Sequence, residues 1–151
     1  FSVAQSCWHL AHVIHKHVGY PEIILRAKQD IDVLVLIPSL LKNTPITFKQ
    51  YKQVRDKEIM KLAGVHEINL NWCSFLSHKG VSALKGVHTI DLSYSQISDK
   101  SLPSMVGVHS INLNACRKIT DEGVKHLAGA HTVKLAYCQN VTDEGITQLS
   151  G

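Results

Sequence analysis

The feature that most constrains this chain is an internal repeat of about 22 residues. Four copies follow one another without a gap, at 65–86, 87–107, 108–129 and 130–151. The second copy is one residue shorter, in the loop after Ser95. A unit this short cannot bury its own apolar face, so successive copies must stack. Stacking creates a long ordered surface without an obvious pocket, which suits binding better than catalysis.

The copy at 108–129 shows how each unit is built. Its apolar positions are Val108, Ile111, Leu113, Ile119, Val124 and Leu127. Ile111 and Leu113 alternate with polar residues, which predicts a half-buried strand, and Val124 and Leu127 share one helical face. Thr120 opens the segment Thr-Asp-Glu-Gly, in which a capping residue precedes two acids, as at a helix start. Gly129 is expected to end the helix at positive φ. Each unit is therefore predicted to be strand, turn, short helix, turn.

This pattern, LxxLxLxxC followed by ITDxGxxxL, resembles the leucine-rich repeat of the cysteine-containing subclass. Cysteine occupies the same place in three copies, as Cys73, Cys116 and Cys138, and Ser95 replaces it in the fourth. Two copies carry I/V-T-D-E-G unchanged. The resemblance covers 65–151. It implies an α/β solenoid that is curved, with parallel strands on the concave face and short helices on the convex face.

The same period extends the array toward the N-terminus. Residues 43–64 fit one more copy, with Tyr51 replacing cysteine, so leucine-rich repeats are predicted over 43–151. Their core positions would be Ile46, Phe48, Val54, Ile59 and Leu62. Residues 21–42 fit loosely as a degenerate first repeat, with Ile23 and Leu25 in its strand. Atypical terminal repeats are expected because an end repeat has only one neighbour.

Residues 1–20 have helical spacing of apolar residues and are followed by Pro21. One interpretation is an N-terminal capping helix that covers the end of the solenoid. The other is a remnant of an F-box, because Val3, Cys7, Trp8 and Leu10 resemble the last helix of that motif. F-box proteins often continue into this repeat class. The opening Leu-Pro segment and the first two helices of the motif do not occur here, so most of the surface that would meet a cullin adaptor lies outside these residues.

Composition narrows the partner class. The net charge of +4 is mild and its basic residues are scattered, which argues against nucleic acid. The longest apolar run, Val33–Ile37, is far too short for a membrane span. Cysteines aligned by the repeat indicate packing rather than disulfides, which favours a cytoplasmic or nuclear location.

The sequence begins at Phe1 without methionine and stops at the end of a copy, so we expect both ends to be interior points of a longer protein.

Three sets of polar residues recur at the repeat period and are candidates for chemical sites. His66, His88, His109 and His131 recur at the second position and should stack about 5 Å apart, without the convergence that zinc needs. The aligned cysteines, and Ser95 in their place, should hydrogen-bond to loop backbone. Asp121-Glu122 and Asp143-Glu144 fall at helix starts and are interpreted as caps. We therefore predict no catalytic residues, no metal, no cofactor and no enzymatic activity.

The remaining candidate site is the concave face. Its predicted partner-binding residues are Glu67, Asn69, Asn71, Trp72, Thr89, Asp91, Ser93, Tyr94, Ser110, Asn112, Asn114, Thr132, Lys134 and Tyr137. Trp72, Tyr94 and Tyr137 form an aromatic row at the strand ends, interrupted by Ala115. Aromatic side chains dominate binding hot spots, although these rings could equally pack on adjacent loops.

These observations favour a protein–protein recognition module, specifically the substrate-binding part of an F-box-type ubiquitin ligase receptor. The alternative is a leucine-rich-repeat scaffold or adaptor unconnected with ubiquitin, with the N-terminal helix only a cap. A membrane or nucleic-acid partner is not expected. Because Gly151 would leave the last copy uncovered, we also expect modest stability.

Overall fold

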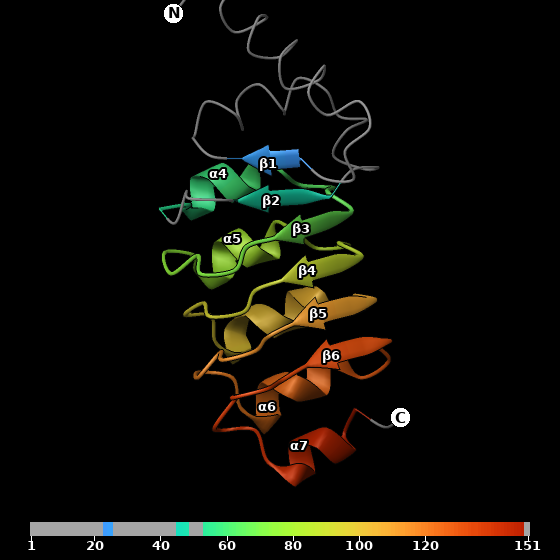
Figure 1. The fold of residues 1–151 in the computed structure, drawn as a ribbon. Helices are drawn as coiled ribbons and strands as arrows, with labels where there is room; N and C mark the ends of the chain where they lie inside the picture. Colours follow the sequence, from blue (N-terminus) through green and yellow to red (C-terminus); the bar gives the residue numbers. More distant parts are fainter. Residues whose placement is uncertain (1–22, 26–44, 49–52, 150–151) are drawn as a thin grey trace, which may run out of the picture.

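The structure, a computed structural model, describes residues 23–25, 45–48 and 53–149. Six parallel strands form one sheet, in the order of the sequence (Figure 1). They are β1 (Ile23–Leu25), β2 (Ile46–Phe48), β3 (Glu67–Asn69), β4 (Thr89–Asp91), β5 (Ser110–Asn112) and β6 (Thr132–Lys134). The predicted α/β class with a parallel sheet is confirmed. The helix predicted at 1–20, most of the repeat predicted at 21–42, and Tyr51 and Gly151 lie outside the described residues.

Each strand from β2 to β6 is followed by a short helical segment, and these segments lie together on one side of the sheet (Figure 1). They are α4 (Asp56–Met60), α5 (His78–Ser82), η1 (Asp99–Met105), α6 (Asp121–Val124), η2 (Lys125–Leu127) and α7 (Asp143–Thr147). The second copy has a 3₁₀ helix, η1, with Pro103 inside it. Proline cannot donate the backbone bond that an α-helix needs at that point. Gly129 has φ of 87°, as predicted for the residue that ends the helical segment.

The strands are in register, so equivalent residues of successive copies are neighbours. Ile68 pairs with Ile90, and Ile90 with Ile111, and all three point into the core. The predicted core positions of the third copy are all buried: Val108, Ile111, Leu113, Ile119, Val124 and Leu127. The core positions predicted at 43–64 are buried as well where they are described: Ile46, Val54, Ile59 and Leu62. The core is thus one apolar layer between the sheet and the helices.

The last copy is less buried than the others. Val133 and Leu135 are only partly buried, whereas their counterparts Ile111 and Leu113 are fully covered. Ile146 is 46% exposed, while its counterpart Val124 is 0% exposed. Apolar surface is therefore uncovered at this end of the described residues, as the sequence predicts. The modest stability expected from it stays a prediction.

Aspartates at the helix starts connect one copy to the next. Asp99 accepts hydrogen bonds from the backbone N–H and the hydroxyl of Thr120, both at 2.8 Å. Asp121 accepts the same pair from Thr142, and Asp56 accepts it from Ser77. Asp121 lies in the first turn of α6, as predicted, and its carboxylate also contacts the residue that precedes the next helix, a role that the sequence did not indicate. We call each of these contacts an aspartate bridge.

Candidate functional site

The outward side chains of the strands form aligned rows, which we call the strand face. The first row contains Glu67, Thr89, Ser110 and Thr132, and the second contains Asn69, Asp91, Asn112 and Lys134. Asn71, Ser93 and Asn114 follow two residues later, at the point where the strands end. The structure thus brings the predicted polar residues together on one face, because register and the two-residue period place them there.

Hydrogen bonds hold the second row in place. The side-chain oxygens of Asn69 and Asn112 each accept the backbone N–H two residues ahead, at 3.0 and 3.1 Å. Asp91 does the same with Ser93 at 2.9 Å and also accepts the Ser93 hydroxyl at 2.6 Å. Its second oxygen accepts the amide of Asn112 at 3.1 Å. Ser93 is buried rather than open to a partner, which corrects the expectation of an outward side chain there.

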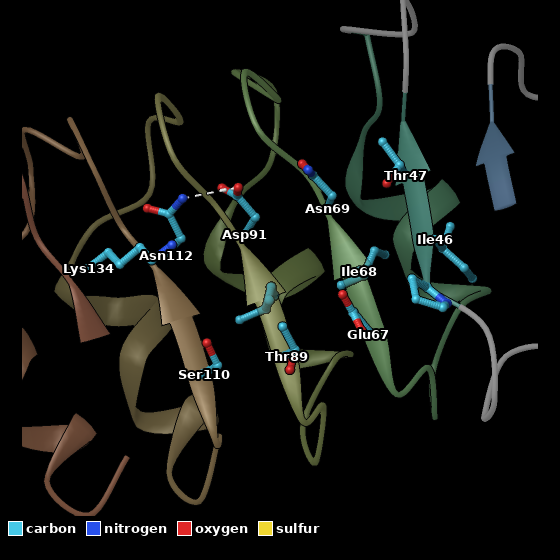
Figure 2. Close-up of a pocket in the computed structure, with 12 residues that line it drawn as sticks. Ile46, Thr47, Glu67, Ile68, Asn69, Thr89, Asp91, Ser110, Asn112 and Lys134 are labelled. Carbon is cyan, nitrogen blue, oxygen red and sulfur yellow. Dashed lines mark hydrogen bonds between the residues drawn. The ribbon is translucent and has the colours of Figure 1, made fainter. Parts of the chain in front are cut away.

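An open hollow of about 220 Å³ lies over the strand face. Figure 2 shows side chains of β2 to β5 arranged around it, with Asp91 and Asn112 joined by their hydrogen bond. Its lining includes the first-row residues Glu67, Thr89 and Ser110 and all of the second row. Pro45 and Thr47 line it too, although they are absent from the set predicted from sequence. The sequence pattern could have identified both residues, because Ile46 is assigned to the core and its two neighbours in the strand then lie on the outward face.

The aromatic row lies beyond the strand ends and has an unusual backbone. Trp72, Tyr94, Ala115 and Tyr137 all have φ between 58° and 62°. This left-handed conformation is disfavoured for bulky side chains. The backbone N–H of Trp72 donates to Ser93, and that of Tyr94 donates to Asn114, both at 2.9 Å. Parallel pairing between copies therefore continues through the turn.

The aromatic rings contact one another and remain exposed. Trp72 and Tyr94 are stacked with centroids 4.4 Å apart and planes inclined by 4°. Their exposed fractions are 49% and 42%. Ala115 interrupts the row, and Tyr137 beyond it is 78% exposed. The row thus offers a stacked, partly exposed aromatic pair rather than rings buried under adjacent loops.

The histidines at the strand starts form a stacked row, as predicted. Successive ring centroids are 4.6, 4.4 and 4.7 Å apart from His66 to His131. The pKa of His109 is lowered, first by desolvation and then by repulsion from the neighbouring imidazoles of His88 and His131. Within the described part of the chain, no group of three or more histidine, cysteine or acidic side chains is placed to hold a metal ion.

The cysteine row is internal and bonded to backbone. Cys116 donates to the carbonyl of Leu92 at 3.2 Å, and Cys138 donates to that of Leu113 at 3.1 Å. Ser95 donates to the same Leu92 carbonyl at 2.6 Å, so serine performs the role predicted for cysteine. All three described cysteines are free and buried. Burial raises the pKa of the Cys73 thiol to about 12, which keeps it in the unreactive thiol form.

No protein-family model matches the chain, and no curated protein matches it significantly. Among the helices of the described residues, none combines the length and the apolar character of a membrane span.

Proposed function

We propose that this chain is a leucine-rich-repeat solenoid that recognises a partner protein on its strand face, the concave side of the array. The observation that carries the proposal is the combination of an open hollow over aligned polar side chains with a stacked, half-exposed aromatic pair. Aromatic side chains that are already held in place bind with little loss of conformational freedom. Polar neighbours give such a surface specificity.

Recognition fits these side chains better than catalysis does. The Asp91 carboxylate is held in orientation by hydrogen bonds from Ser93 and Asn112, and it lies in an open hollow rather than in a pocket that excludes water. Among the cysteines, Cys73 is buried and its pKa is raised, so a thiolate nucleophile is disfavoured. The four histidines stack in parallel instead of converging on one point. We therefore propose a binding protein and not an enzyme.

A finer proposal is that the partner is a substrate of a cullin-type ubiquitin ligase. It rests on the resemblance of Val3, Cys7, Trp8 and Leu10 to the last helix of an F-box, followed by this class of repeat. These four residues lie outside the described part of the chain. In the alternative, the same segment covers one end of the array, and the protein is a scaffold in the cytoplasm or nucleus without a connection to ubiquitin.

Affinity capture from eukaryotic cells, with quantitative mass spectrometry, tests the recognition proposal. The variant Trp72→Ala with Tyr94→Ala removes the stacked pair, and we expect it to lose at least about tenfold of the captured partner. Met60→Ala is the matched control, because Met60 is 47% exposed but lies on the helix side. Equal recovery of the partner by the unmodified chain and by both variants would contradict recognition by the strand face.

The ubiquitin connection needs a separate comparison. This chain and the chain extended by whatever coding sequence precedes Phe1 are used as parallel baits. Recovery of cullin and its adaptor by the extended bait alone supports the F-box interpretation. Recovery of the same partners by both baits, without cullin or adaptor, supports a scaffold.

A further inference from the structure

We infer that the strand face recognises a basic segment of its partner, with an arginine side chain placed over Asp91 and Glu67. Because this names the chemistry of the partner, it rests on the proposed function. An acidic centre on the strand face, beside exposed aromatic rings, is what a guanidinium group recognises best. Its planar fork pairs with carboxylates, and its flat surface stacks on aromatic rings.

The charge of the strand face is opposite to that of the whole chain. The chain carries a net charge of +4. The outward positions of β3, β4 and β5 nevertheless hold two carboxylates, Glu67 and Asp91, and no lysine or arginine. Lys134 in β6, farther along the second row, is the one cation among the outward positions of β3 to β6. An incoming cation therefore meets a locally negative hollow on an otherwise basic protein.

The negative charge of Asp91 exceeds what the local backbone requires. Asn69 and Asn112 occupy the same register position on either side of it. Both accept the backbone N–H two residues ahead through a neutral amide, at 3.0 and 3.1 Å. A neutral amide therefore suffices for this turn. The carboxylate adds a charge that this backbone turn does not need, and hydrogen bonds from the N–H and hydroxyl of Ser93 and from the amide of Asn112 hold it in orientation.

Glu67 supplies the second carboxylate in the same hollow. It is half-buried, faces Thr89 across the strand pair, and lines the hollow together with Asp91 (Figure 2). Among the residues that the structure describes, its carboxylate has no hydrogen bond or ion pair. A half-buried acid without a local partner is stabilised when a cationic side chain binds beside it.

The aromatic pair lies at the neighbouring edge of the same strands. Trp72 and Tyr94 are each three residues beyond the second row, in the turn that follows the strand. Their stacked rings are about half exposed. An extended segment that places arginine over the acids thus brings neighbouring residues within reach of the rings, where apolar side chains or a guanidinium can stack.

The test uses the purified full chain and three pools of fluorescent peptides, random except for one fixed central residue: arginine, its neutral isostere citrulline, or glutamate. We expect the arginine pool to bind at least about tenfold more tightly than the citrulline pool, because a charge-assisted pair is lost. Asp91→Asn with Glu67→Gln should abolish this preference. Glu122→Gln with Asp143→Asn, which neutralises two exposed carboxylates in the first turns of α6 and α7, should keep it. Melting curves confirm that each variant is folded.

Absence of an arginine preference, including absence of any binding, overturns the inference. A preference that survives in the Asp91→Asn, Glu67→Gln variant overturns it too, as does tighter binding of the glutamate pool. None of these results affects cellular capture through Trp72 and Tyr94, so recognition by the strand face can stand while its basic partner fails. If a single-stranded oligonucleotide competes at this face, the partner is nucleic acid, and both proposals fail.

Discussion

Among the junctions between copies within 53–149, three contain an aspartate bridge, and the junction between the copies at 65–86 and 87–107 does not. At the bridged junctions, Asp56, Asp99 and Asp121 contact Ser77, Thr120 and Thr142. At the remaining junction, His78 occupies the aspartate position and Ser98 is the residue that it would contact. Both kinds of junction share strand pairing and the apolar core. The second copy also has the 3₁₀ helix η1, so single substitutions are needed to isolate what the bridge contributes.

A glycine accompanies every bridge. A Cβ at Gly80, Gly123 or Gly145 would collide with the bridging carboxylate of the preceding copy. Where the aspartate is replaced by His78, the glycine is replaced as well, by Ser101. Ser101 is 1% exposed, and its hydroxyl lacks a hydrogen-bond partner. Aspartate, hydroxyl residue and glycine thus behave as one set divided between two copies, and the glycine is needed for space rather than for its backbone angle.

Gly123→Ala should break a bridged junction and have the largest effect. Alanine normally stabilises a helix by about 1 kcal/mol relative to glycine. Here we expect the opposite sign, a loss of about 1–3 kcal/mol, because the added methyl group meets Asp99 and Leu102. Ser101→Ala is the control at the unbridged junction and should be neutral or slightly stabilising. Urea unfolding measures both, and stabilisation by Gly123→Ala would contradict the packing explanation.

Asp99→Ala removes the aspartate of the same set. It deletes the hydrogen bonds from the N–H and hydroxyl of Thr120, and we expect a loss of about 2 kcal/mol in the free energy of unfolding. The carboxylate that alanine at position 123 would meet is then gone. In a double-mutant cycle, Gly123→Ala should therefore cost less in the Asp99→Ala background. Additive effects would show that the two residues are independent.

The unbridged junction should gain stability when the missing set is restored. His78→Asp with Ser101→Gly places a carboxylate beside the N–H and hydroxyl of Ser98, and we expect a gain of about 1 kcal/mol. His78→Asp alone should give no gain, because the Cβ of Ser101 occupies the space of the carboxylate. Thermal and urea unfolding of both variants provide the measurement. Equal effects of the single and double changes would refute the pairing of aspartate with glycine.

The bridges should also make stability depend on pH, as the smallest of these effects. Hydrogen bonds from the side chain and backbone of Thr142 hold the pKa of the Asp121 carboxyl below its ordinary value. This stabilisation is complete above the ordinary pKa and is lost as pH falls through the lowered folded-state pKa. The difference in unfolding free energy between the natural chain and Asp121→Asn should therefore shrink in acid. A difference that is constant with pH would count against an ionised bridge.

Sequence periodicity was enough to predict features that belong to a single copy. The strand at Ser110–Asn112, the buried Ile111 and Leu113, and the positive φ of Gly129 each follow from local pattern. Alignment of equivalent positions also predicted the histidine stacking and the serine that replaces cysteine. These features need only the period and the assumption that copies stack in register.

Features that depend on the distance between copies escaped the sequence. The contact of Asp121 with Thr142 requires the placement of the next helix, and a local cap was the simpler expectation. Positive φ at Trp72 has no signal in a residue that rarely adopts it. The hollow over Glu67 and Asp91, and the burial of Ser93, depend on how the strands lie beside one another. Packing geometry decides these features, and residue pattern does not.

Site-specific photo-crosslinking in cells tests recognition by the strand face most directly. A photoreactive amino acid is placed at Thr89, in the first row over the hollow, and in a second protein at Lys79, on α5. The proposed function predicts a partner protein crosslinked from position 89 and not from position 79. Crosslinks formed only from position 79 would contradict it and place the partner on the helix side.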